Sequence, residues 1–312
     1  MIELRNLNHV YPGNIQAVKD LNLKIDDNKI CVLIGPSGCG KSTVLNMINK
    51  LIGISSGEIL IDGVSIEEIE TVELRRNIGY AIQEISLFPH KTVGENIATV
   101  PNLKKWSKDK KNQRVEELLT LMGLEPERYK DKYPLQLSGG EQQRVGVARA
   151  LGANPPILLM DEPFGAVDPI ARTRLQDEFL LIQEKINKTI VFVTHDIDEA
   201  IKMGDYIAIL NKGELVQYGT PREILQNPVN KFVEDFMGED RNVKSLQLIF
   251  AEEIVEQEDS YCLETEDYNA VRDKLGKTTL NSLPILDTNK KLVGYMSLRN
   301  IGKKIPKTGP KK

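Results

Sequence analysis

Hydrophobic residues in this chain form short continuous runs separated by polar segments. The clearest runs of strand length are rich in isoleucine, valine and leucine, and they cover residues 30–34, 157–160, 189–194 and 206–210. Continuous apolar runs of this length are typical of parallel strands buried on both faces. Helix-period patterns accompany them at residues 42–51, 113–122, 140–152 and 169–186. This alternation of strands and helices predicts an α/β protein.

The same pattern predicts that the chain is divided into two regions. Residues 1–240 carry the alternation, and within them residues 91–151 lack strong strand signals, which predicts a mostly helical insert. From residue 241 the pattern changes: acidic residues dominate 252–273, whereas the 25 residues after Asp287 contain eight basic residues and no acidic one. We therefore expect an α/β domain over 1–240, with its helical insert at about 91–151, and a small second region over 241–312 that ends in a basic tail.

Charge and composition exclude some classes of protein. The net charge is -4, which excludes a globally basic nucleic-acid binder, so no nucleic-acid partner is expected. No run of about 18 apolar residues occurs, so no membrane-spanning helix is predicted and any link to a membrane is expected through partners. Three cysteines without paired spacing fit a reducing compartment.

A glycine-rich loop follows the strand at 30–34 and opens a helix, which is the required context of a phosphate-binding loop. Its residues are Gly35, Pro36, Ser37, Gly38, Cys39, Gly40, Lys41, Ser42 and Thr43. Glycines let the backbone amides wrap phosphate oxygens, Lys41 neutralises the β- and γ-phosphates, and Ser42 can bind Mg²⁺. Cys39 could be a nucleophile or a small loop residue, and no base is positioned beside it by the sequence.

Two adjacent carboxylates end the apolar strand at 157–160. Asp161 suits the Mg²⁺ shell, and Glu162 suits the base that orients an attacking water. Ligands of such sheets bind at the carboxyl ends of the strands. An exposed acidic pair at a strand end is the alternative, and the phosphate-binding loop makes it the weaker one.

A third motif separates the families that share such a loop. Residues 137–144 read LSGGEQQR and resemble the signature of ATP-binding cassette (ABC) proteins, so the chain is similar to an ABC transporter ATPase over about residues 1–240. The resemblance implies a P-loop NTPase core that binds ATP and Mg²⁺. It further implies that Tyr11 stacks on adenine, that Gln83 senses Mg²⁺ and the γ-phosphate, and that His195 contacts the γ-phosphate. Residues 165–168 resemble the loop that contacts a second subunit. Tyr11 could equally be a turn aromatic.

The signature also implies a dimer. A serine and two glycines at a helix start form an anion site, and in the family this site closes over the ATP of a second subunit. The residues expected to do so are Ser138, Gly139, Gly140 and Glu141. Two such half-sites make an isologous homodimer with two ATP molecules between the chains. Glu141 replaces the common glutamine, which puts a negative charge near the partner's nucleotide.

Less specific stretches indicate a subgroup. Residues 83–90, 92–97, 100–106 and 234–241 resemble the ATPases of importers for quaternary amines such as glycine betaine, carnitine and choline. That resemblance implies two integral-membrane permease subunits, a separate substrate-binding protein, and a peripheral position on the cytoplasmic face of the membrane. An importer ATPase for another small solute is the alternative. A soluble ABC ATPase of DNA repair or translation is weaker, because such proteins have tandem cassettes, heptad arms or a basic groove.

The second region resembles part of a regulatory module. Residues 282–287 and 291–299 are similar to one cystathionine-β-synthase (CBS) repeat, a small α+β unit that usually occurs in pairs. Residues 241–312 have room for about one repeat, so pairing across the dimer and nucleotide binding there both stay open. The charge pattern of this region could report ionic strength or contact anionic lipid, or it could be only a solvated surface.

Overall fold

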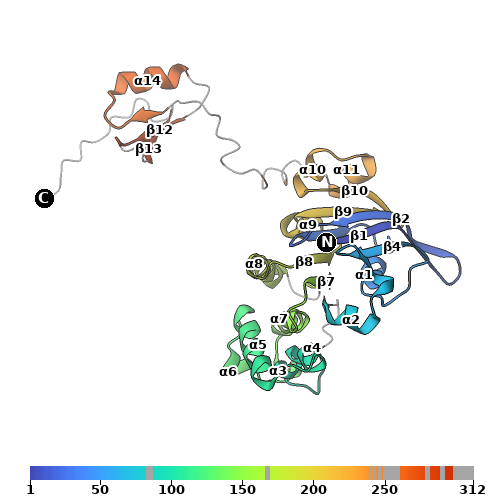
Figure 1. The fold of residues 1–312 in the computed structure, drawn as a ribbon. Helices are drawn as coiled ribbons and strands as arrows, with labels where there is room; N and C mark the ends of the chain where they lie inside the picture. Colours follow the sequence, from blue (N-terminus) through green and yellow to red (C-terminus); the bar gives the residue numbers. More distant parts are fainter. Residues whose placement is uncertain are drawn as a thin grey trace. The chain divides into compact units, whose positions relative to one another are not determined.

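The computed structural model describes residues 1–81, 87–165, 169–238, 241, 244, 248, 261–277, 282–288 and 292–297. It consists of two compact units, Met1–Leu248 and Ile249–Lys312 (Figure 1). Gln83 and residues 166–168, for which the sequence predicts contacts with ATP and with a partner, lie outside the described residues. In the described part of the chain no helix is both long and apolar enough to cross a bilayer.

A six-stranded sheet forms the centre of the first unit, with the strand order β10-β9-β3-β8-β7-β6. Five of these strands are parallel, and only β10 runs antiparallel to its neighbour β9. The strands are β3 (Ile30–Ile34), β6 (Ile78–Ala81), β7 (Ile157–Asp161), β8 (Thr189–Val193), β9 (Tyr206–Asn211) and β10 (Glu214–Gly219). The predicted α/β class is therefore confirmed, and all four predicted strands lie in this sheet.

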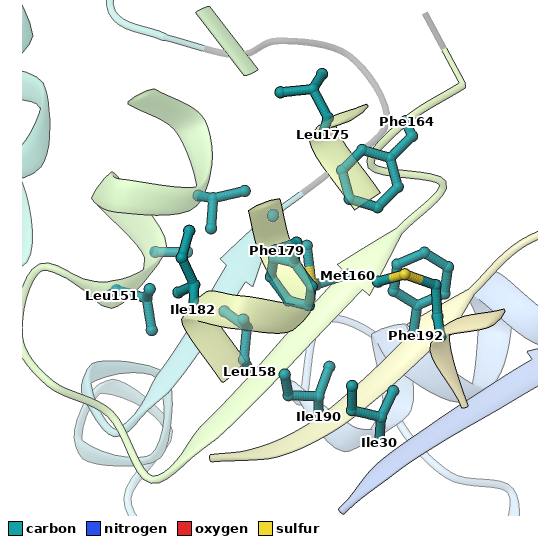
Figure 2. Close-up of a cluster of buried hydrophobic side chains, with 14 of the residues drawn as sticks. Ile30, Leu151, Leu158, Met160, Phe164, Leu175, Phe179, Ile182, Ile190 and Phe192 are labelled. Carbon is teal, nitrogen blue, oxygen red and sulfur yellow. The ribbon is translucent and has the colours of Figure 1, made fainter. Parts of the chain in front are cut away.

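Helices cover one face of this sheet. Every residue of β3 and β8 is buried, and alternate side chains enter two separate cores. Figure 2 shows the first core, in which Leu175, Phe179 and Ile182 of helix α8 (Pro169–Ile186) pack over strand residues. The same core takes residues from α7 (Gly139–Leu151), α9 (Ile197–Met203), α10 (Pro221–Gln226) and α11 (Lys231–Met237).

The opposite face packs on a second sheet of four strands, ordered β2-β1-β4-β5. Its strands are β1 (Ile2–Tyr11), β2 (Ile15–Ile25), β4 (Ser56–Ile61) and β5 (Val64–Ser65). Helix α1 (Lys41–Ile48) also contributes to this second core through Val44, Leu45, Met47 and Ile48. A short 3-10 helix (Ile66–Glu68) and α2 (Thr71–Arg76) lead from this sheet to β6. The phosphate-binding loop therefore connects a strand buried on both faces to a helix whose apolar side packs into the second core.

Residues 91–151 are helical. They contain α3 (Val93–Ile97), α4 (Thr99–Leu103), α5 (Lys108–Leu121), α6 (Pro126–Tyr129), a short 3-10 helix (Pro134–Gln136) and α7. Figure 1 shows α3 to α7 gathered into one group. The sequence places the start of α5 at residue 113, but Ser107 caps the helix by accepting a hydrogen bond from the Lys110 amide. Its first residues are charged and polar, so they carry no apolar period that would reveal the earlier start.

Gly146 in the middle of α7 offers a test of stability. A Cβ added there would meet no atom within 4 Å among the residues that the structure describes, and Gly146 has ordinary helical backbone angles. We expect Gly146→Ala to raise the free energy of unfolding by about 0.5–1 kcal/mol, because alanine loses less backbone entropy in a helix. Thermal unfolding followed by circular dichroism should show a midpoint about 2 °C higher. A lower midpoint would mean that this glycine is required by packing.

The second unit contains β11 (Cys262–Leu263), α14 (Tyr268–Lys277), β12 (Ser282–Leu286) and β13 (Leu292–Ser297). Strand β12 pairs in parallel with β11 and antiparallel with β13. Cys262, Val271 and Leu283 are buried in it. The first unit extends beyond the predicted boundary at residue 240, since Arg241 donates to the Leu225 carbonyl and Lys244 pairs with Asp198. The CBS-like repeat stays a prediction, because residues 289–291 and 298–299 lie outside the described part.

Candidate active site

The loop between β3 and α1 wraps tightly because glycines occupy its most crowded positions. Gly35 has φ +149°, and a Cβ there would lie 2.1 Å from the Leu210 carbonyl oxygen. Gly40 has φ +103°, and a Cβ there would lie 2.4 Å from the Ala17 carbonyl oxygen. Neither position accepts a side chain, so glycine there allows the loop to pack tightly against the backbone at residues 17 and 210. The loop opens onto the N-terminus of α1, which favours an anion.

Lys41 brings a positive charge to the inner side of this loop. Its side chain is only 7% exposed, and Nζ donates to the carbonyl oxygens of Gly35 at 2.8 Å and Pro36 at 3.1 Å. Cys39 Sγ lies 3.7 Å from the same ammonium. Burial raises the pKa of the Cys39 thiol, although Lys41 acts in the opposite direction. The buried thiol fits a small loop residue better than a nucleophile.

Ser42 and Asp161 join the loop to the end of β7. Ser42 Oγ donates to Asp161 Oδ1 at 3.1 Å. Burial raises the pKa of Asp161 and the neighbouring Glu162 carboxylate adds to the rise, while the Ser42 hydroxyl and Lys41 lower it. Mg²⁺ prefers one or two protein oxygens and completes its shell with water and phosphate. The two side-chain oxygens therefore fit a Mg²⁺ ion, which would neutralise charge on the phosphate oxygens when bound.

Glu162 and His195 meet at the carboxyl ends of neighbouring strands. His195 Nδ1 lies 3.1 Å from Glu162 Oε2, and the Glu162 backbone amide donates to the Val193 carbonyl at 2.9 Å. Glu162 has φ +44°, a left-handed conformation that costs a non-glycine residue about 1–2 kcal/mol. Such outliers occur often at functional sites, where the surrounding structure holds them. Of the chain's three histidines, His195 is the one that the fold brings to the carboxylate pair.

Tyr11 lies at the end of β1, beside the phosphate-binding loop. Its hydroxyl is 3.4 Å from Thr43 Oγ1, and its ring is 36% exposed. The ring of His9 packs edge-on against it, with 4.4 Å between centroids and 84° between planes. His9 is itself anchored, since its Nδ1 lies 2.8 Å from the Gly53 carbonyl oxygen. An aromatic face supported in this way can stack on a base bound near Thr43.

Ser138 and Glu141 build the start of α7. The Ser138 hydroxyl accepts from the Glu141 amide at 3.4 Å, and the Glu141 carboxylate accepts from the Ser138 amide at 2.8 Å. Tyr129 donates its hydroxyl proton to the other Glu141 oxygen at 2.6 Å and lowers the pKa of that carboxyl. Both oxygens of Glu141 are thus engaged within the chain. The charge that the sequence places near a partner's nucleotide is directed toward its own helix and Tyr129.

The fold assembles one group of the predicted site residues. Direct contacts join Ser42 to Asp161, Glu162 to His195 and Tyr11 to Thr43, all around the loop that holds Lys41. Ser138, Gly139, Gly140 and Glu141 belong instead to the helical part of the unit, where Ser138 and Gly139 are exposed. The sequence did not predict the buried pair of Glu199 and Gln176, whose side chains are joined by a hydrogen bond of 2.9 Å. The available signal was a glutamate three residues after a capping aspartate, on the apolar face of a short helix.

The site combines a phosphate-binding loop, a carboxylate pair at the end of one strand and a histidine at the end of the neighbouring strand. Together these define a P-loop nucleotide-binding protein of the α/β class. Comparison with known proteins identifies the family. Residues 18–165 match the family described as ABC transporter. The osmoprotectant import ATP-binding protein OsmV of Salmonella typhimurium is 44% identical over 308 residues, covering 96% of this chain and 80% of the relative. The chain belongs to the ABC transporter family.

A further protein sequence and a solved structure are also similar to this chain. The glycine betaine/carnitine/choline transport ATP-binding protein OpuCA of Bacillus subtilis is 56% identical over 245 residues, which are 78% of this chain. The match spans 64% of that relative, just under two thirds of its length. Among solved structures, the dimeric bacterial ABC transporter cassette MJ0796 aligns with a TM-score of 0.63 and 38% identity, covering 70% of this chain and 98% of that one. The P-loop NTPase fold predicted from the sequence is thus confirmed.

Proposed function

We propose that this chain hydrolyses ATP to drive import of a quaternary-amine osmoprotectant such as glycine betaine, carnitine or choline. It acts as the nucleotide-binding subunit of an ABC importer, on the cytoplasmic face of the membrane. Its partners are a second copy of itself, two integral-membrane permease subunits and a separate substrate-binding protein. The observation that carries the hydrolysis is the pairing of Glu162 with His195 beside a complete phosphate-binding loop, and the substrate class is supported by the similarity to OpuCA and OsmV.

Each residue of the loop side has a distinct task. Tyr11 stacks on adenine, the loop amides and Lys41 hold the β- and γ-phosphates, and Ser42 with Asp161 provides the oxygens for Mg²⁺. Glu162 orients the attacking water and accepts its proton. His195 contacts the γ-phosphate and holds the Glu162 carboxylate in place through the 3.1 Å contact. Gln83 senses the γ-phosphate and Mg²⁺.

The signature residues act on the ATP of the second copy. Gly139 has ordinary helical backbone angles, and a Cβ added to it would meet no atom of the described residues within 4 Å. Packing inside one chain therefore does not require a glycine there. Close approach of a ligand or of another chain would require a residue without a side chain at this exposed helix start. A composite pocket, with the loop from one copy and the signature from the other, supplies that approach.

A groove in the first unit suits a permease segment. It has a volume of about 420 Å³, and its lining includes Tyr80 and Phe88, which flank the segment containing Gln83. Arg76, Arg149 and Val100 line it too, so it combines apolar walls with basic side chains. A polypeptide segment that fills this groove would contact Tyr80 and Phe88, between which Gln83 lies in the sequence. Solute binding and ATP hydrolysis are coupled through this contact.

The test is transport by the reconstituted complex. The chain, with the permease that copurifies with it, should drive ATP-dependent uptake of labelled glycine betaine into liposomes when the binding protein is supplied. Gly139→Asp should reduce uptake at least about tenfold, because a like charge near the phosphates costs more than about 1.4 kcal/mol. The isolated variant should not lose thermal stability, since an acid in the first turn favours the helix.

Two results would contradict different parts of the proposal. Uptake of another small solute, without uptake of any quaternary amine, would agree with an importer ATPase but contradict the proposed substrate class. Unchanged uptake by Gly139→Asp would mean that the signature does not close on a partner's ATP. Gly146→Ala is the matched control, because it adds a methyl group to the same helix in an equally open place and should transport normally.

A further inference from the structure

A buried carboxylate that the proposed reaction does not use lies in the helix that follows His195. Glu199 is in the first turn of α9 and is only 6% exposed. Burial raises the pKa of Glu199, against the effect of its hydrogen bonds. A carboxyl group is rarely buried to this extent unless it is held by partners. The elements to which these partners belong indicate the role of the Glu199 carboxylate.

The two partners of Glu199 come from different elements. Gln176 of α8 donates its side-chain amide to Glu199 Oε1 at 2.9 Å, and both side chains are buried. Thr194, which directly precedes His195 and is 1% exposed, interacts with the same carboxylate and lowers its pKa. Glu199 therefore connects the turn that carries His195 to helix α8.

The turn itself is closed by a second set of hydrogen bonds. Thr194 Oγ1 accepts from the Asp196 amide at 3.0 Å, and Asp196 Oδ1 accepts from the amides of Asp198 and Glu199 at 2.9 and 3.2 Å. Arg172 of α8 reaches Asp196 Oδ2 at 3.7 Å. Both sides of the turn are thus attached to α8, one through a buried contact and one nearer the surface.

His195 depends on this turn for its position. Its side chain is 60% exposed, so packing around the ring contributes little to holding it against Glu162. The backbone at residues 194–196 must supply that placement. Helix α8 is a firm support, because its apolar face is built into the core through Leu175, Phe179 and Ile182 (Figure 2).

We propose that Glu199 is a positioning residue for His195: its carboxylate fastens the turn at residues 194–196 to α8 through Thr194 and Gln176. The inference rests on the proposed role of His195 in ATP hydrolysis. Helix α8 begins directly after residues 166–168, where the sequence resembles the loop that contacts a second subunit. Glu199 thereby ties His195 to the same helix that follows this loop. The alternative is that Glu199 only joins two helices and has no effect on the reaction.

A double-mutant cycle separates these alternatives. We expect Glu199→Gln to lower the kcat of ATP hydrolysis about tenfold with KM for ATP changed less than about twofold, since one of the two carboxylate oxygens is replaced by an amide nitrogen, which cannot accept a hydrogen bond. In a His195→Ala background, already strongly impaired, the same change should add less than about a twofold loss. Gln176→Leu, which removes the donor from α8, should show the same non-additivity. Thermal unfolding midpoints must show that each variant is folded.

The outcomes are distinct. Normal kcat for folded Glu199→Gln and Gln176→Leu, or equal losses with and without His195, would overturn the inference. Normal hydrolysis by His195→Ala alone would instead overturn the proposed role of His195. Gln183→Leu is the matched control: Gln183 is also a buried glutamine of α8, but its amide donates to the Lys188 carbonyl at 2.8 Å. It should lower stability and leave kcat unchanged.

Discussion

Glu162→Gln is expected to reduce steady-state ATP hydrolysis by about 1,000-fold while leaving ATP binding intact. The amide has the shape of the carboxylate, so the contact with His195 and the left-handed backbone at this residue can persist. It cannot accept the proton of the attacking water, and hydrolysis stops at that step. Phosphate release measured at saturating ATP and Mg²⁺ gives the rate.

The same variant should accumulate as an ATP-bound dimer, because hydrolysis is what reopens the composite pocket. Size-exclusion chromatography with ATP should show a dimer, and without nucleotide a monomer. Glu95→Gln serves as control, since it is a similar change in the capping box of α3. If Glu162→Gln hydrolyses ATP at the normal rate, the assignment of the catalytic base is wrong. If it stays monomeric with ATP at every concentration and with its permease, the composite pocket is wrong.

Lys41→Ala is expected to weaken ATP binding by about 1,000-fold, and the loss of hydrolysis follows from that. The ammonium group is buried at the mouth of the loop, 2.8 Å from the Gly35 carbonyl, and no other lysine or arginine is part of this loop. Removing it leaves the triphosphate without a buried counter-charge. Binding is measured by titration calorimetry with ATP, where the heat of the variant should fall to the level of dilution.

The control must distinguish lost binding from lost folding. Lys41→Ala without nucleotide should retain a cooperative unfolding transition, since the loop geometry is set by its glycines and by the cores on either side. Lys19→Ala removes an exposed lysine paired with Glu214 and should bind ATP normally. Normal affinity in Lys41→Ala would place the triphosphate elsewhere. The two variants thus separate binding from chemistry, since Glu162→Gln should bind and Lys41→Ala should not.

The central sheet could be predicted because of how parallel strands are buried. A strand covered on both faces, such as Ile30–Ile34 or Thr189–Val193, is apolar at nearly every position, and that leaves a continuous run in the sequence. Strands β1 and β2 carried no such run. Each has exposed as well as buried positions, and polar residues are interspersed along both. They pair with each other across the turn at residues 12–14, whereas the pairing of β1 with β4 joins segments far apart along the chain, which no local pattern contains.

Most of the candidate site could be predicted from the sequence for a different reason. Phosphate binding requires a fixed order of glycines, lysine and hydroxyl within one turn, so Gly35 to Thr43 can be recognised locally. The pairing of Glu162 with His195 cannot, because it depends on β7 and β8 being neighbours in the sheet. The orientation of Glu141 could not be predicted either. Its charge is engaged by Tyr129 of another helix, which only the packing of α6 against α7 provides.

The amino-acid sequence by itself determined the class of fold, the phosphate-binding loop and the family, because each of these is encoded in residues close together along the chain. Only the tertiary structure decided which distant groups touch: Ser42 with Asp161, Glu162 with His195, and Glu199 with Gln176. The physical reason is that a contact between separate strands and helices depends on register and packing of the whole core. Those are properties of the folded chain and not of any single segment.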